Sequence, residues 1–391
     1  MSDLKFSKLA QIGIFPVGNT SLTHTPSIEC TTFLADTVQQ LPKINQRNLT
    51  SINDQPLNDL YYGGVDTPTT RQLASKIASI EKGQFSTLTP SGQSAISLLL
   101  LSFLKPGDHI LAIDTVIYST KWLLDNCHNM GVTVEYFTPA DACTLNSKLR
   151  KETKLIFIEN PGSITYELID ICTIVNSCSA HPALIVIDNT WAASIFQYPL
   201  EMGADISLIS MSKTHAAIEG VSLGALITRR KDLYVKIKTT SALIGNHVSS
   251  HTCAAAIRAL STLGARLSFQ MNTTRAAIKY LESTQLCSKI LHPTTQYTDD
   301  TLRQLKINGF NSLLTLELSC SSDDLTRRMN RLRLIKIGYG WGGSISLINI
   351  AETSNLPSAK RLNLSTSCVR LYLGLEGPND LLTDLGNMLN N

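Results

Sequence analysis

A series of short apolar runs, most of which lack a clean alternation of polar and apolar residues, constrains the fold above all. The clearest lie at 110–113, 132–137, 155–158 and 183–187, and helix-like stretches separate them. A strand with one face in water alternates polar and apolar residues, so runs without alternation indicate strands buried on both faces. Helical crossovers between such strands are typical of a parallel sheet. The sequence therefore predicts an α/β doubly wound domain with a mostly parallel central sheet.

The pattern of polar and apolar residues changes twice along the chain and predicts three parts. Residues 1–60 are polar and irregular, which favours an N-terminal arm that contacts a neighbouring subunit. Residues 61–250 hold the α/β pattern. In residues 251–391 a helical stretch at 251–283 is followed by strand-like segments and a terminal helix near Asn379, which predicts a smaller C-terminal α+β domain. Its strand-like segments lie at 312–318, 344–350 and 369–373.

Charge and hydropathy favour a small-molecule partner. The 34 basic and 31 acidic residues are scattered and give a net charge of +3, without the charge runs typical of nucleic-acid or membrane binding. The longest apolar run, 97–104, is far short of the roughly 20 residues that span a bilayer. Residues 1–10 lack a signal-peptide pattern, so we expect a cytoplasmic protein. Nine cysteines without a C-x-x-C pair indicate free thiols, and no histidine spacing predicts a metal site.

Polar residues at the ends of apolar runs are the first candidates for chemistry, because ligands of open parallel sheets bind beyond the carboxyl ends of the strands. Asp188 ends the run 183–187, Lys213 closes 206–213, and Ser91-Gly92 precedes a helix. A glycine before a helix start offers backbone N–H groups to a phosphate. A lysine can form an imine with an aldehyde, and an aspartate can pair with a pyridinium nitrogen.

These three features together describe pyridoxal 5'-phosphate (PLP). Taken alone, each has another interpretation. Asp188 fits a helix cap, Ser91-Gly92 a plain turn and Lys213 a surface lysine; only their combination indicates a cofactor site.

Five segments carry a resemblance to a known family: Pro-Ser-Gly at 90–92, Glu-Asn-Pro-Gly-Ser-Ile-Thr at 159–165, Ile-Asp-Asn-Thr-Trp-Ala-Ala at 187–193, Tyr-Gly-Trp-Gly-Gly at 339–343 and Val-Arg-Leu at 369–371. Across nearly the whole chain the sequence resembles bacterial cystathionine β-lyases of the Cys/Met-metabolism PLP-dependent family. The second and third segments resemble the β-lyase branch more than the γ-synthase or γ-lyase branches. The resemblance implies an aspartate aminotransferase-like fold (PLP fold type I). It also implies a homotetramer, a dimer of dimers whose active sites are shared across the dimer interface.

The resemblance also implies roles for individual residues. Lys213 matches the Schiff-base lysine, Asp188 the partner of the pyridine nitrogen, and Arg370 the clamp on the substrate's α-carboxylate. The remaining matches are Gly92 and Gln93 as backbone phosphate donors, Ser210 and Ser212 as hydroxyls before the lysine, Tyr339 and Trp341 on the substrate side, and Tyr62 as a catalytic tyrosine reaching the adjacent subunit's site. Residues 338–343 also satisfy G-x-G-x-x-G, but no helix follows, so we reject a dinucleotide site.

Three departures from the family surround the cofactor. Gly64 stands where the family has an arginine that crosses the interface to the phosphate. A hydrogen bond to a charged group is worth about 1.5–3 kcal/mol, so PLP affinity should fall unless a group such as Arg71 substitutes. Ile117 stands where an aromatic residue stacks on the pyridine ring, and Tyr118 follows it. Either the loop shifts by one residue or an aliphatic side chain packs on the ring. Residues 214–220 also depart from the usual pattern.

The reaction that the resemblance implies is β-elimination of L-cystathionine to homocysteine, pyruvate and ammonia, a transsulfuration step in methionine biosynthesis. Lys213 would remove the α-proton while Asp188 keeps the ring protonated. Within the same chemistry, a broader cysteine-S-conjugate lyase or cysteine desulfhydrase stays open, as does an amino-acid (alanine) racemase. From another class, a catalytically eroded structural or binding homologue also stays open.

Overall fold

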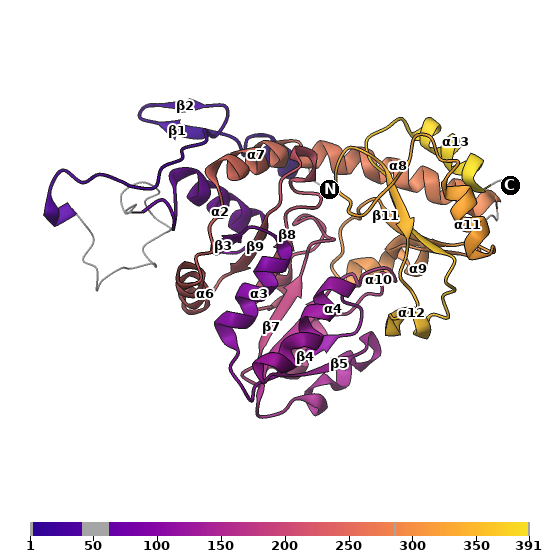
Figure 1. The fold of residues 1–391 in the computed structure, drawn as a ribbon, viewed down its shortest axis with the longest axis horizontal. Coiled ribbons are helices and arrows are strands. Elements are labelled where there is room, and N and C mark those ends of the chain that lie inside the picture. The colour runs from indigo at the N-terminus through magenta and orange to yellow at the C-terminus, as the bar shows by residue number, and fades with distance from the viewer. Residues whose placement is uncertain (1–2, 41–61, 285–286, 390–391) are drawn as a thin grey trace.

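A seven-stranded sheet forms the centre of the large part of the molecule, seen in a computed structural model that describes residues 3–40, 62–284 and 287–389 (Figure 1). The strand order is β3-β9-β8-β7-β6-β4-β5. The strands are β3 (Phe85–Thr89), β4 (His109–Ile113), β5 (Thr133–Phe137), β6 (Thr153–Glu159), β7 (Leu184–Asp188), β8 (Ile206–Ser210) and β9 (Gly224–Thr228). The five strands β5, β4, β6, β7 and β8 are mutually parallel, and β9 runs antiparallel to both β3 and β8.

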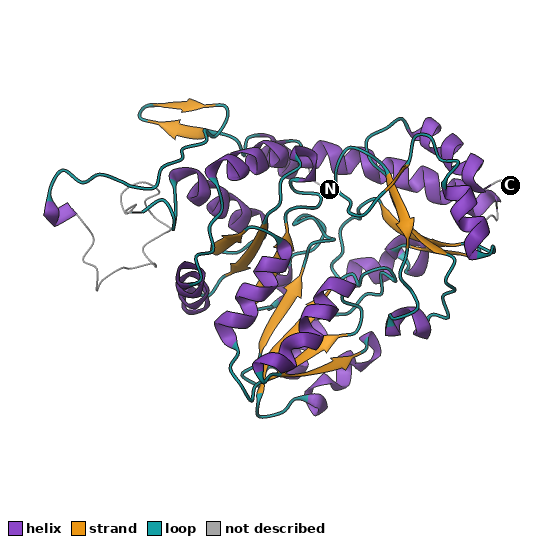
Figure 2. Ribbon diagram, viewed as in Figure 1, coloured by secondary structure: helices purple, strands orange, loops and turns teal. Residues whose placement is uncertain are grey.

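The predicted mostly parallel sheet is confirmed, because the four predicted apolar runs coincide with β4 to β7. All five residues of β4 are buried, as a strand covered on both faces requires. Helices lie on both sides of this sheet (Figure 2): α3 packs against α6, and α2 against α7. The helices are α2 (Pro68–Ile80), α3 (Gly92–Phe103), α4 (Tyr118–Asp125), α5 (Ile171–Cys178), α6 (Lys231–Leu243) and α7 (Ser250–Ser261).

The C-terminal part is a separate, smaller α+β unit with its own apolar core, as predicted. Its five-stranded sheet has the order β10-β11-β14-β13-β12 and is antiparallel except between β12 and β13. The strands are β10 (Lys289–Leu291), β11 (Leu313–Glu317), β12 (Lys336–Ile337), β13 (Leu347–Ile350) and β14 (Cys368–Tyr372). Its helices are α8 (Leu263–Thr284), α9 (Pro293–Gln296), α10 (Asp299–Gln304), α11 (Ser322–Met329), α12 (Pro357–Arg361) and α13 (Pro378–Leu389).

Two boundaries differ from the sequence prediction. The single helical stretch expected at 251–283 is two helices, since α7 ends at Ser261, Thr262 caps it, and α8 begins at Leu263. The strand expected at 344–350 is shortened to β13 (Leu347–Ile350). Residues 344–346 lie in a loop instead, where the backbone N–H and the hydroxyl of Ser346 donate hydrogen bonds to the Glu376 carboxylate. Neither change alters the layers, and the exact domain limits at residues 60 and 250 stay a prediction.

The N-terminal segment lies partly on its own chain. Helix α1 (Asp3–Ala10) packs against α7 and α8, where the ring of Phe6 leaves room for nothing larger than Gly264. A hairpin of β1 (Phe15–Val17) and β2 (Thr20–Leu22) follows and stands away from the large sheet in Figure 1. Residues 41–60 of the predicted arm lie outside the described residues, so its contact with a neighbour stays a prediction.

The described part of the chain contains neither a candidate membrane span nor a candidate metal site. None of its helices is long and apolar enough to cross a bilayer. Its His, Cys, Asp and Glu side chains form no group of three that could hold a metal ion. All nine cysteines are free thiols.

Candidate active site

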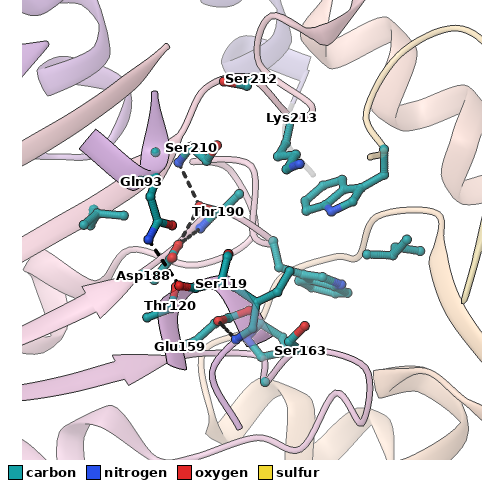
Figure 3. A pocket seen from close by; sticks show the side chains of 18 of the residues that line it. Gln93, Ser119, Thr120, Glu159, Ser163, Asp188, Thr190, Ser210, Ser212 and Lys213 are labelled. Atoms are coloured by element: carbon teal, nitrogen blue, oxygen red, sulfur yellow. Dashed lines mark hydrogen bonds between the residues drawn. The ribbon is translucent and has the colours of Figure 1, made fainter. Parts of the chain in front are cut away.

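A cavity of about 290 Å³ opens where the parallel strands end and brings together most of the predicted site residues (Figure 3). Its walls come from the ends of β6, β7 and β8, the start of α3, the loop before α4, and strand β14 of the C-terminal unit. The predicted residues that line it are Gly92, Gln93, Asp188, Ser210, Ser212, Lys213, Trp341 and Arg370. Strand ends of the large sheet therefore face Arg370 of the smaller one across one space.

Asp188 is held so that one carboxylate oxygen stays available. The Thr190 hydroxyl donates to Asp188 Oδ1 at 2.5 Å, and the Thr190 backbone N–H donates to the same oxygen at 3.0 Å. Within the described chain Oδ2 accepts no hydrogen bond. Burial raises the pKa of Asp188, while the Thr190 bonds and the charge of Lys213 lower it. The free oxygen suits a protonated ring nitrogen, which would keep the carboxylate charged.

Lys213 presents a partly desolvated amine to the same cavity. Its Nζ lies 6.0 Å from the centre of the Trp341 ring and makes no hydrogen bond or ion pair with a described residue. Burial lowers the pKa of Lys213, and the nearby charge of Arg370 lowers it further, against an opposing effect of Asp188. A lysine with an accessible neutral form is what imine formation with an aldehyde needs.

The start of α3 has free backbone N–H groups that suit an anion. The Ser91 hydroxyl caps the helix by accepting from the Ser94 N–H at 3.0 Å, and the first-turn N–H groups of Gly92 and Gln93 have no acceptor within the helix. Position 92 must be glycine, because a Cβ there would lie 2.5 Å from Ser210 Cβ. Strand β8 therefore approaches the helix start closely.

The hydroxyls of the two serines before the lysine differ in their hydrogen bonds. The Ser210 hydroxyl makes no hydrogen bond to the part of the chain that the structure describes. The Ser212 hydroxyl donates to Leu223 O at 3.0 Å and accepts from Leu223 N at 2.9 Å. Ser210 is thus the freer of the two to bind a phosphate.

Arg370 is a half-buried cation without a counter-ion. Its guanidinium forms no ion pair or hydrogen bond within the ranges described here. Burial lowers the pKa of Arg370, which Tyr166, Tyr339 and Glu159 oppose, and an arginine stays charged in proteins. A cation withdrawn from water without a partner is costly, so the position fits an anionic ligand group.

Glu159 and Thr190 complete the site and were not assigned a role from the sequence. Glu159 ends β6 directly beside Asp188 in the strand register, and its Oε2 accepts from Ile117 N at 2.7 Å. Burial and the charge of Asp188 raise the pKa of Glu159 well above its usual range. The rule that found Asp188, a polar residue at a strand end, would also have found Glu159.

Two predicted residues lie away from this cavity in their own chain. Tyr62 is 52% exposed and forms a β-bridge with Thr32, and Tyr339 is 80% exposed. Neither lines the cavity, although the Tyr339 phenol raises the pKa of Arg370. An exposed Tyr62 is compatible with a contact to a neighbouring subunit, and that role stays a prediction.

The structure bears on two of the departures from the family and decides one of them. Ile117 lines the cavity, whereas Tyr118 is 64% exposed, so the loop does not shift to place the aromatic ring inside. Arg71 lies buried 3.7 Å from Asp66, which Lys238 contacts at 2.8 Å, and it lines a different pocket. Arg71 therefore does not reach the cavity of its own subunit, and its substitution for the arginine missing at Gly64 across the interface stays a prediction.

The fold and the site define a PLP-dependent enzyme. The chain belongs to the Cys/Met metabolism PLP-dependent enzyme family, whose sequence model matches residues 10–390. It is 32% identical to an L-alanine/L-glutamate racemase of Wolbachia pipientis wMel, over 86% of this chain and 84% of that protein. It is 29% identical to a cystathionine β-lyase of Bordetella avium, over 84% and 83% of the two chains. The structure of cystathionine γ-lyase from Lactobacillus plantarum complexed with L-serine matches with a TM-score of 0.86 and 26% identity, covering 99% and 98% of the two chains.

Proposed function

We propose that the enzyme is a carbon–sulfur β-lyase that cleaves L-cystathionine to homocysteine, pyruvate and ammonia. The observation that carries this proposal is that Lys213 and Arg370, both without a counter-ion among the described residues, face one cavity with the free oxygen of Asp188. Several relatives named cystathionine β-lyase, at 27–29% identity, support the choice of reaction.

Each residue at the cavity would have a separate role in the reaction. Bound PLP would supply an electron sink for the bonds at the substrate's α-carbon. Gly92, Gln93 and Ser210 would hold its phosphate, and Asp188 Oδ2 would accept the ring N–H. Arg370 would bind the α-carboxylate and so fix the α-carbon near Lys213, whose Nζ would remove the α-proton and hold it. Trp341 would cover the amine from water, since its ring lies over Nζ.

A second candidate is amino-acid racemisation. The 32% identical relative named an L-alanine/L-glutamate racemase favours it. Both reactions begin with removal of the α-proton, and they differ in whether a β-substituent leaves or the proton returns. A broader cysteine-S-conjugate lyase shares the elimination step. We further propose the homotetramer of paired dimers, in which Tyr62 reaches the adjacent subunit's site.

One steady-state experiment separates these reactions. Purified enzyme with added PLP is given L-cystathionine, L-cysteine and L-alanine in parallel, with pyruvate, free thiol and D-alanine measured. Pyruvate together with homocysteine from cystathionine supports the proposal, and D-alanine without pyruvate refutes it in favour of the racemase. The variant Lys213→Ala should lose the visible absorbance of the lysine-bound cofactor and all turnover.

A further inference from the structure

Tyr166 carries a buried hydroxyl that the proposed mechanism does not use. It follows β6 in a left-handed backbone conformation (φ 51°), is 1% exposed, and lines the cavity. Its Oη has no partner in hydrogen-bond geometry within the described residues. Buried tyrosine hydroxyls normally have a partner, so an orphaned one that lines a ligand cavity indicates a contact with the ligand.

The surroundings of this phenol identify the chemistry of that ligand. Thr315 and Arg370 are directly opposed residues of β11 and β14, so their side chains lie on the same face of the smaller sheet. Both lower the pKa of the Tyr166 phenol, Arg370 through its charge and Thr315 through a hydrogen-bonding contact of poor geometry, and the Thr315 hydroxyl is likewise buried without a partner in good geometry. A cation and two hydroxyls without a well-formed hydrogen bond therefore meet where the loop after β6 faces the C-terminal sheet.

We propose that Tyr166 donates a hydrogen bond from Oη to the α-carboxylate of the bound amino acid, beside the guanidinium of Arg370. A carboxylate has about four acceptor positions, and a bidentate arginine uses two of them, so a third donor has a place to bind. Burial raises the pKa of Tyr166 to about 12, so the phenol keeps its proton at neutral pH and remains a donor. The inference rests on the proposed function only in taking an α-amino acid as the ligand.

Glycine and methylamine make the test specific for the carboxylate. Both carry an amine, only glycine carries the carboxylate, and neither has a β-substituent to lose. Binding of each to the holoenzyme is measured by calorimetry. In Tyr166→Phe the Kd for glycine should rise about tenfold or more, the range of a hydrogen bond to a charged group, while the Kd for methylamine should not change.

Tyr297, which follows α9 and contacts the loop that carries Tyr166, provides a matched control. Its hydroxyl accepts from Leu168 N at 3.0 Å, two residues from Tyr166, and it does not line the cavity. Tyr297→Phe should therefore lower the melting temperature but leave glycine binding unchanged. Tyr166→Phe should do the reverse, since within the described chain it removes only the poor-geometry contact with Thr315.

The outcomes separate this inference from the proposed reaction. Unchanged glycine affinity in Tyr166→Phe, equal weakening for glycine and methylamine, or an equal loss of glycine binding in Tyr297→Phe each overturns the role of Tyr166. A wild-type enzyme that binds glycine but releases no pyruvate from cystathionine overturns only the proposed reaction. A wild-type enzyme that binds no glycine overturns both.

Discussion

Replacing Thr190 by valine should weaken cofactor binding by one to two orders of magnitude. The Thr190 hydroxyl joins two strand ends, because it donates to Asp188 Oδ1 at 2.5 Å and accepts from Ser210 N at 2.8 Å. Valine keeps the shape but removes both bonds. A hydrogen bond to a carboxylate is worth about 1.5–3 kcal/mol, or roughly 10- to 100-fold in affinity. The orphaned Ser210 N–H should cost the folded protein about a further 1–3 kcal/mol whether or not PLP is bound.

The sign of the pH effect follows from Asp188. Burial raises the pKa of this carboxyl and the Thr190 bonds lower it, so the valine variant should raise that pKa further. Since only the carboxylate form pairs with a ring N–H, PLP binding in the variant should be lost at a higher pH on acidification than in the wild type. The assay is titration of the apoenzyme with PLP at several pH values, together with urea unfolding. Thr190→Ser, which keeps the hydroxyl, is the control; wild-type affinity and pH profile in Thr190→Val would refute the reasoning.

Three further changes have expected outcomes. Ile117→Tyr should tighten PLP binding by a few-fold in an equilibrium titration, because an aromatic pair adds about 0.5–1.5 kcal/mol; weaker binding would show that the cavity cannot accept the ring. Arg370→Lys should raise KM much more than it lowers kcat, since it loses the bidentate fork; an unchanged KM would contradict a carboxylate clamp. Arg361, which binds Asp114 at 2.6 and 3.1 Å and Glu167 at 3.0 Å, joins α12 to two loops at the cavity. Arg361→Gln should lower the free energy of unfolding by less than the roughly 3–5 kcal/mol of a fully buried pair, because its side chain is partly exposed, and no change in urea denaturation would show that the pairs add nothing.

The sequence predicted the layers of the fold because burial on both faces leaves a direct mark on strand composition. The runs that became β4, β6 and β7 are apolar throughout, and that pattern is incompatible with an open antiparallel sheet. Strand direction leaves no such mark. The antiparallel pairing of β9 with β3 and β8 could not be read from hydrophobicity, since it depends on the path of the chain between strands.

For the site, position along the chain predicted the strand-end residues but not the contacts between loops. Asp188 and Lys213 follow apolar runs, so they are found by the rule that ligands bind beyond the carboxyl ends of parallel strands. The Thr190 bridge to Ser210 and the approach of Tyr166 to Arg370 join segments 20 or more residues apart. No local spacing signals such contacts, so Tyr166 reads as an ordinary loop residue until its hydroxyl is found buried without a partner.

The departures from the family around the cofactor site change which interactions would contribute most to PLP binding. Ile117 would give a bound ring an aliphatic wall instead of an aromatic one, and Arg71 lies 3.7 Å from Asp66, outside the cavity of its own subunit. Within one subunit, binding of PLP would then depend on the start of α3, on Lys213 and on Asp188. Because Thr190 orients Asp188 and also bonds the backbone at Ser210, one side chain supports both the ring and the phosphate ends of the site. A chain that lacks the stacking ring and the interface arginine should therefore be unusually sensitive to loss of that single hydroxyl.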